Sequence, residues 1–158
     1  MSANTPQSRK SKGRTFQNHV REMLLDTFPT LTERDIVSRS MGSKGTDIML
    51  SEEASKKIPF DVECKRSEHI NIWSSFFQSF TRANETGNLP LLVFRRNRSQ
   101  VMCAMEFEVL LDLLAKCCNY IEGEGQCPRD ILLRRDKKPI VDKHRAFKIT
   151  TEERTDNV

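Results

Sequence analysis

Asp47, Glu63 and Lys65 are the residues whose types and spacing have the clearest chemical use. They lie in two stretches in which apolar and polar residues alternate, as they do in half-buried strands. Because side chains on a strand point alternately to its two faces, Asp61, Glu63 and Lys65 share one face. If the two stretches pair as neighbouring strands, both carboxylates lie beside one cleft, where they could hold Mg²⁺ with waters and a substrate phosphate. The Lys65 ammonium would then stabilise charge on that phosphate or orient the attacking water.

The same pattern has a simpler interpretation. A strand that shows Asp, Glu and Lys on one face is also typical of a solvated surface with salt bridges, and the spacing alone favours neither. A glycine-bearing loop, residues 40–45, enters the Asp47 stretch. Its backbone amides, with Ser43 and Lys44, could approach a phosphate closely. The alternative for this loop is an ordinary turn.

Helices and strands alternate along the chain and must position these residues. The predicted helices are 15–27, 72–84 and 105–118, and the predicted strands are 35–40, 45–50, 59–65, 89–94 and 100–104. The polar stretch 51–57 is expected to be a connection. This order predicts an α/β fold, a single domain with a central mixed β-sheet flanked by helices. The almost wholly apolar run 89–94 predicts a central strand covered on both faces.

The apolar residues of these elements predict the core. On the strands, the face opposite the carboxylates carries Ile48, Leu50, Val62 and Cys64, and Cys103 also resembles a small buried hydrophobe. The remaining residues expected inside are Ile36 and Val37, then Phe16, Val20, Met23 and Leu24, then Trp73, Phe76, Phe77 and Phe80, then Phe107, Leu110, Leu111 and Leu114.

The order and surroundings of the acidic residues resemble a known nuclease signature. Gly45-Thr46-Asp47-Ile48 followed by Asp61-Val62-Glu63-Cys64-Lys65 is similar to the motif of PD-(D/E)XK nucleases, which include restriction enzymes, repair nucleases and Holliday-junction resolvases. A closer resemblance to small phage-encoded nucleases of this superfamily, over about residues 10 to 115, rests on Lys12-Gly13-Arg14, Ser40-Met41-Gly42, Trp73 and Pro90-Leu91-Leu92-Val93. The resemblance implies a restriction-endonuclease-like core and metal-dependent catalysis by the acidic pair and its lysine.

The resemblance also implies roles for residues around this set. It implies that Gln78 borders the active site, and we add the backbone carbonyl of Cys64 to the metal ligands. Many such nucleases place a glutamate of the first helix near the metal. Here Gln17 occupies the early position that often holds it, so Glu22 is the nearest acidic candidate. The alternative is that Glu22 is a surface residue.

Positive charge gathers at the two ends of the chain. The formal net charge is +4, but residues 1–21 carry five Lys or Arg and no acid, and residues 129–148 carry eight against three acids. Such ends favour a polyanionic partner, with a solubilising tail as the alternative. The residues predicted to contact nucleic acid are Arg9, Lys10, Lys12, Arg14, Ser43, Lys44, Arg66 and Arg82.

Composition limits the class of protein. Five cysteines without a C-x-x-C pair indicate neither a disulfide framework nor a zinc ribbon, and a thiol-rich chain without a signal peptide predicts the cytoplasm of a bacterial or infected cell. No apolar run approaches the length of a membrane span.

The chain is expected to form one domain with a tail at each end. We expect a basic flexible tail over 1–12, a nuclease core over 13–120 and a basic C-terminal extension over 121–158.

These observations predict a Mg²⁺-dependent DNA endonuclease, with Mn²⁺ able to substitute, that acts as a homodimer on branched DNA such as Holliday junctions and has no small-molecule substrate. One alternative is a nuclease of ordinary duplex or single-stranded DNA in genome processing or degradation. Another is a nucleic-acid-binding protein that keeps the fold without catalysis. The intact set of Asp47, Glu63 and Lys65 argues against the last.

Overall fold

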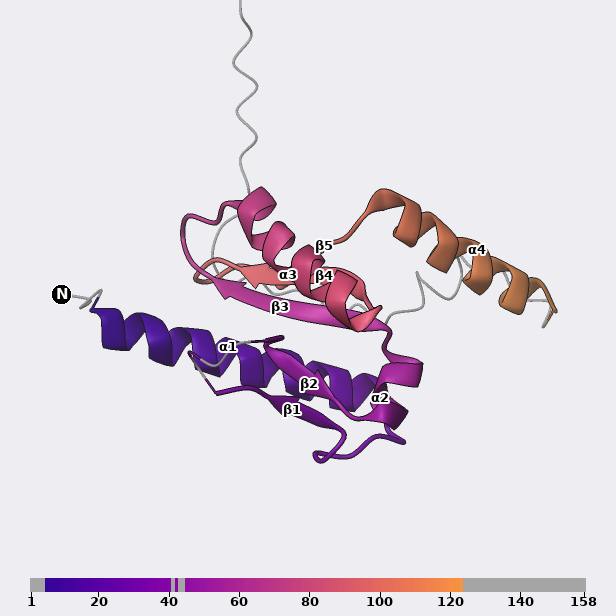
Figure 1. The fold of residues 1–158 in the computed structure, drawn as a ribbon, viewed down its shortest axis with the longest axis horizontal. Coiled ribbons are helices and arrows are strands. Elements are labelled where there is room, and N and C mark those ends of the chain that lie inside the picture. The colour runs from indigo at the N-terminus through magenta and orange to yellow at the C-terminus, as the bar shows by residue number, and fades with distance from the viewer. Residues whose placement is uncertain (1–4, 41, 43–44, 124–158) are drawn as a thin grey trace, which may run out of the picture. The chain divides into compact units, whose positions relative to one another are not determined.

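The computed structural model describes residues 5–40, 42 and 45–123. The chain divides into two compact units, Met1–Leu113 and Leu114–Val158, and each is described by itself. The helices are α1 (Pro6–Thr27), α2 (Glu52–Lys57), α3 (Ile72–Thr86) and α4 (Phe107–Gly123), and the strands are β1 (Ile36–Ser38), β2 (Ile48–Leu50), β3 (Phe60–Arg66), β4 (Leu89–Arg95) and β5 (Met102–Ala104) (Figure 1). None of the helices described is long and apolar enough to cross a membrane.

The strands form two sheets. In the larger one the order is β3-β4-β5, with β3 parallel to β4 and β4 antiparallel to β5. The predicted α/β fold with a mixed sheet between helices is confirmed, and β4 is its central strand. The smaller sheet is the antiparallel pair β1-β2. Among the described residues β2 and β3 share no ladder, so the condition that the Asp47 and Glu63 stretches pair as neighbouring strands is not met.

A few hydrogen bonds replace that ladder. The Asp47 amide donates to the Val62 carbonyl at 3.2 Å, and the Thr46 hydroxyl donates to the same carbonyl at 3.1 Å. Asp47 itself lies just before β2 begins. These bonds anchor the start of β2 to the middle of β3, and this anchor places the Asp47 carboxylate.

α1 begins much earlier than predicted. Thr5 caps it, accepting a hydrogen bond from the Ser8 amide at 3.3 Å, and Pro6 stands in the first turn, where its missing amide costs nothing. The expected start at Thr15 is wrong, and residues 6–12, expected as flexible tail, are helical. The helix continues through Gly13, although glycine in a helix interior is about 1 kcal/mol less stable than alanine. The division of the chain into tail, core and extension stays a prediction, and 124–158 lie outside the described residues.

The stretch 51–57 contains a helix, α2, that the sequence analysis did not predict. Ser51 caps it, accepting from the Ala54 amide at 3.1 Å. Its other signals were also in the sequence, because Glu52 and Glu53 stand four residues before Lys56 and Lys57 and form ion pairs with them at 2.9 and 3.1 Å.

The core lies where α1 and the small sheet meet one face of β3. Phe16 and Val20 from α1 pack with Ile36, Ile48 and Val62, and all five are buried. Leu50 and Cys64 lie on this side as predicted, and Val93 of β4 joins them. α1 runs along one side of β3 and α3 along the other (Figure 1), so β3 is covered on both faces.

α3 buries a stripe of small residues, whereas the predicted aromatic stripe is only half-buried at Phe76 and Phe80. Its buried residues are Ser75, Ser79 and Ala83, while Trp73 is 84% exposed and Phe77 is 66% exposed. The expected aromatic core stripe is therefore wrong at these two positions. Small side chains let the helix backbone approach the strands closely. The Ser79 hydroxyl then donates to the Asp61 carbonyl at 2.7 Å and accepts from the Leu91 amide at 3.1 Å, which ties α3 to both strands.

Several other residues predicted to be buried are exposed in the described part of the chain. They are Met23, Val37, Cys103, Phe107, Leu110, Leu111 and Leu114. Val37 follows the buried Ile36 on a strand, so the two side chains point to opposite faces. On α4 the apolar periodicity correctly predicted a helix, but periodicity does not say which element covers the apolar stripe.

Asp35 provides a test of how β1 and α2 are joined. Its carboxylate accepts from the Thr32 amide at 2.8 Å, the Thr32 hydroxyl at 2.7 Å and the Ser51 hydroxyl at 2.8 Å. The hydrogen bonds from Thr32, above all, lower the pKa of Asp35 below 3.8. A lowered pKa contributes stability above 3.8 that is lost as the pH falls through the folded-state pKa.

Asp35→Asn should therefore lower the melting temperature at about pH 7 and much less at about pH 3. Asp26→Asn, at an exposed position, is the control and should leave the melting temperature at about pH 7 close to the parental value.

Candidate active site

The Asp47 carboxylate is held against the centre of β3. Its Oδ2 accepts a hydrogen bond from the Cys64 amide at 2.8 Å, and its own amide bonds Val62. Gly45, two residues earlier, has φ of +115°, a conformation that other residues rarely adopt. The turn that delivers Asp47 to β3 therefore depends on this glycine.

The β3 face that points toward α3 carries a compact charge cluster. Lys65 Nζ lies 2.6 Å from Glu63 Oε1, and Arg82 Nη2 donates to Glu63 Oε2. Arg82 Nε also lies 3.6 Å from Asp61 Oδ1. Only 2% of Asp61 and 4% of Glu63 is exposed, so two carboxylates are buried here with two cations as partners. Burying them without these cations would cost several kcal/mol each.

α3 supplies the other polar groups of the cluster. Gln78 Oε1 accepts from Lys65 Nζ at 2.9 Å, and Arg82 lies one helical turn further on. Because Ser75, Ser79 and Ala83 face the strands, Gln78 and Arg82 lie at the edge of the helix beside the Glu63 face of β3. The structure thus brings together the predicted Asp47, Glu63, Lys65 and Gln78.

The carboxylates influence one another. Burial, and then the negative charge of Glu63, raise the pKa of Asp47, while the Cys64 amide and the charges of Lys65 and Arg82 oppose this shift. Burial likewise raises the pKa of the Cys64 thiol, helped by the charges of Asp47 and Glu63. Cys64 is therefore a neutral core residue and not a nucleophile.

The donor set fits a hard divalent cation. Asp47 and Glu63 lie near enough to repel each other, and Asp47 has a second oxygen beyond the one bonded to Cys64. Mg²⁺ commonly takes only one or two carboxylates, with water and phosphate oxygens completing its octahedron. Within the described residues no group of three or more His, Cys, Asp or Glu could hold a metal ion. Such a pair suits Mg²⁺ or Mn²⁺ and does not suit a structural zinc.

Glu22 does not join this pair in the described part of the chain. It lines a separate pocket with Arg66, whose side chain points to the α1 face of β3. Gln17 is buried on α1, and its Oε1 has no hydrogen-bond partner among the residues that the structure describes. Of the three predicted acidic ligands, Asp47 and Glu63 therefore lie together and Glu22 lies apart. The Cys64 carbonyl as a further ligand stays a prediction.

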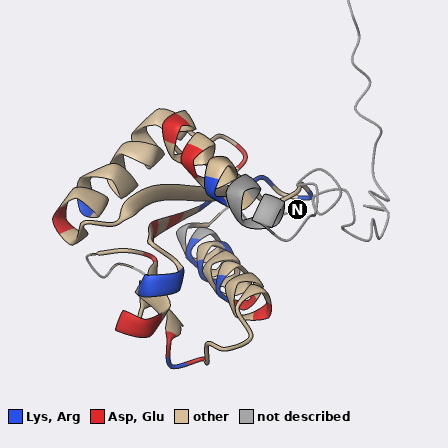
Figure 2. Cartoon of the chain, turned by 90° about the vertical axis from the view of Figure 1, so that its right-hand side faces the viewer, with Lys and Arg blue, Asp and Glu red and all other residues tan. Residues whose placement is uncertain are grey.

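The residues predicted to bind nucleic acid are distributed over several places. Lys and Arg residues repeat along α1, where Lys10 and Arg14 are exposed and Lys12 is half-buried (Figure 2). Arg82 is instead engaged by the two buried carboxylates. The side chain of Arg9 and residues Ser43 and Lys44 lie outside what the structure describes.

The sequence analysis missed the structural roles of Asp61 and Arg82. Asp61 was placed on the Glu63 face, but alternation could not show that α3 would cover this face. Arg82 was predicted to contact nucleic acid, and only the packing of α3 shows that it is a counter-ion. A Ser75, Ser79, Ala83 stripe at helical spacing was the signal that could have identified the buried side of α3.

Arg82 should stabilise the fold more than any surface cation. Arg82→Gln leaves Asp61 without its cation and Glu63 with Lys65 alone, so the free energy of unfolding should fall by about 3 kcal/mol. The matched control is Lys56→Gln, which breaks an exposed i,i+4 pair with Glu52 and should cost less than about 0.5 kcal/mol. Urea unfolding measures both, and equal losses would contradict a buried charge cluster.

Comparison with known proteins identifies one family. Residues 8–125 match the family model described as "Phage putative PDDEXK endonuclease". The matched range contains Asp47, Glu63 and Lys65 and almost every described helix and strand. No curated protein and no solved structure matches the chain.

Proposed function

The chain belongs to the phage PDDEXK endonuclease family, and from this premise we propose that it hydrolyses DNA phosphodiesters with Mg²⁺, or Mn²⁺, held by Asp47 and Glu63. The observation that carries the proposal is the hydrogen bond from the Cys64 amide to Asp47, which holds the Asp47 carboxylate against β3, the strand that carries Glu63. A bound divalent cation would lower the pKa of a coordinated water and offset charge on the phosphate. The carbonyl of Cys64 is the proposed third ligand.

Lys65 is the proposed electrostatic partner of the phosphate. Its ammonium lies between Glu63 and Gln78, and both hold it on the Glu63 face of β3. From there it can stabilise charge on the phosphoryl oxygens or orient water toward the phosphorus. Gln78 acts by positioning Lys65, and Arg82 acts by holding Glu63.

Removing the acidic pair should stop the chemistry without unfolding the protein. Glu63→Gln, Asp47→Asn and Lys65→Met should each lower the cleavage rate in Mg²⁺ at least about a hundredfold, as losses of charged active-site groups do. Lys56→Met, on the exposed helix α2, is the matched control and should cleave at the parental rate. A Glu63→Gln protein that cleaves at the parental rate would refute the assignment of the site.

Asp47→Asn also serves as its own folding control. Because the pKa of Asp47 is raised above 3.8, the folded state favours the protonated acid. The stability gained from that protonated form is present below 3.8 and is lost as the pH rises through the folded-state pKa. At neutral pH the neutral amide should therefore melt at the same temperature as Asp47 or higher. Loss of cleavage with an unchanged or raised melting temperature separates catalysis from folding.

The proposed substrate is branched DNA cut by a homodimer. Nicking two opposed strands of a four-way junction needs two sites, and the described part of the chain offers one candidate metal-binding pair, so a two-fold dimer is the simplest arrangement. An exposed apolar surface that could serve as its interface includes Trp73 and Phe107, which line one pocket and are 84% and 70% exposed. Tryptophan and phenylalanine are enriched in such interfaces.

Matched substrates test this proposal. Four-way junction, flap, duplex and single-stranded DNA of equal length are compared at one salt concentration, with light scattering to measure mass. The protein should be a dimer that nicks opposed strands of the junction, and Trp73→Glu should yield monomers, whereas Glu53→Gln on α2 should not. Equal cleavage of duplex and junction would reject branch selectivity and keep the nuclease. Metal-independent binding with no cleavage of any DNA would favour the binding-protein alternative.

A further inference from the structure

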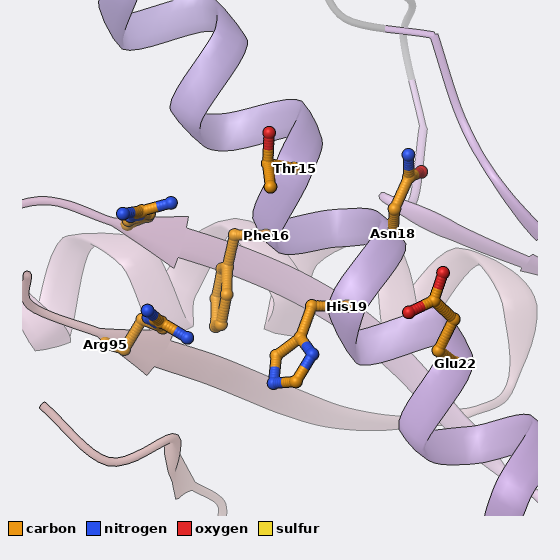
Figure 3. Close-up of a pocket in the computed structure, with 7 residues that line it drawn as sticks. Thr15, Phe16, Asn18, His19, Glu22 and Arg95 are labelled. Atoms are coloured by element: carbon orange, nitrogen blue, oxygen red, sulfur yellow. The ribbon is translucent and has the colours of Figure 1, made fainter. Parts of the chain in front are cut away.

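We propose that a pocket between α1 and the C-terminal ends of β3 and β4 binds a backbone phosphate of the nucleic acid, separate from the phosphate that is cleaved. The pocket has a volume of about 450 Å³ and is lined by Thr15, Phe16, Asn18, His19, Glu22, Arg66 and Arg95 (Figure 3). The identity of the polyanion rests on the proposed function, whereas the anion site rests on the pocket itself.

Two arginines stand side by side in this pocket. Arg66 and Arg95 are direct partners in the parallel ladder of β3 and β4. Like charges at neighbouring positions of adjacent strands repel each other. Neither forms an ion pair with an acidic side chain of the described residues, and the Nε atom of each is buried without a hydrogen-bond partner. The two guanidinium groups therefore have no ion-pair partner among the described residues that would offset the cost of burying their positive charges.

The other contacts of the two guanidinium groups position them but do not neutralise them. Arg66 Nη2 donates to Asn97 Oδ1 at 3.4 Å, a long hydrogen bond. The Arg95 guanidinium lies 5.7 Å from the centre of the Phe16 ring, within the range of a cation–π contact. Since Phe16 is a buried core residue, this contact holds Arg95 on a rigid support.

A phosphate group supplies what the arginines lack. Its oxygens accept paired hydrogen bonds from the planar guanidinium fork, and its charge offsets the cost of burying cations. Figure 3 shows Arg95 beside Phe16 at one end of the pocket and Glu22 at the other, with His19 between them. The Glu22 carboxylate thus lies away from Arg95, and an anionic ligand could bind at the Arg95 end of the pocket.

The pocket and the active site lie on opposite faces of one strand. Glu63 and Lys65 point toward α3, whereas Arg66 and Arg95 share the face of Cys64, toward α1. Lys65 and Arg66 are consecutive residues at the end of β3. A nucleic-acid strand that passes this end can place one phosphate at Lys65 and another in the pocket, so the pocket would fix the position of the strand relative to the acidic pair.

Binding of fluorescent DNA to the full-length chain in EDTA tests the pocket without requiring cleavage. Arg95→Gln should weaken binding about tenfold or more, the value of one charged hydrogen-bonded contact, and should lower the slope of log K against log salt by about one. Arg34→Gln is the matched control, because Arg34 is exposed and does not line the pocket. It should bind as the parent does.

A second variant avoids the core contact of Arg95. His19 is exposed and lines the pocket, so His19→Asp introduces a repelling carboxylate while both arginines remain. It should weaken binding, whereas His69→Asp, in the exposed loop before α3, should not. Parental affinity in both Arg95→Gln and His19→Asp would overturn the proposal.

The Nε–Hε NMR signals of Arg66 and Arg95 identify the source of the phosphate. An oligonucleotide should shift both signals. Shifts with inorganic phosphate alone would make the pocket a site for free phosphate and overturn the nucleic-acid assignment. If Arg95→Gln loses affinity while the parent cleaves no DNA, the pocket stands and the proposed nuclease activity fails. If the parent cleaves and Arg95→Gln binds normally, the nuclease stands and the pocket is rejected.

Discussion

The structure depends on two carboxylates buried in the middle of a strand that is covered on both faces. Asp61 and Glu63 can be there only because Arg82 reaches them from α3 and Lys65 from the strand itself. This requirement explains why α3 presents serine and alanine to the strands and leaves Trp73 and Phe77 outside. A bulky stripe at this interface would move the helix away from the strands and Arg82 away from the carboxylates.

The same cluster joins folding to chemistry. Asp47 joins the cluster by accepting a hydrogen bond from the Cys64 amide. Burial and the charge of Glu63 raise the pKa of Asp47, so the ionised form of Asp47 is unfavourable in the folded protein. Active sites often hold such charges at a cost in stability, and a divalent cation is the ligand that would relieve repulsion between two carboxylates. The phage PDDEXK endonuclease family, to which the chain belongs, gives this arrangement its chemical context.

The end of β3 presents positive charge on both of its faces. Lys65 belongs to the acidic cluster, while Arg66 and its ladder partner Arg95 point to the pocket beside α1. Lys and Arg also recur along α1 (Figure 2). A small domain can in this way contact several phosphates of one strand without reading bases, and recognition of backbone and shape is what such contacts support.

The sequence by itself determined which residues are candidates for the site and, apart from α2, the order of the elements. Asp47, Glu63 and Lys65 were identified from local alternation and a short motif, because side-chain direction along a strand follows from its period alone, and Gln78 was added by the resemblance to known nucleases. Only the tertiary structure decided which apolar stripe is buried, since Phe77 and Phe107 have the same periodicity whether or not another element covers them. It also decided that β2 and β3 meet through isolated hydrogen bonds, that Arg82 is a counter-ion and that Arg66 and Arg95 converge. Each of these depends on contacts between residues far apart in the chain, which no local pattern encodes.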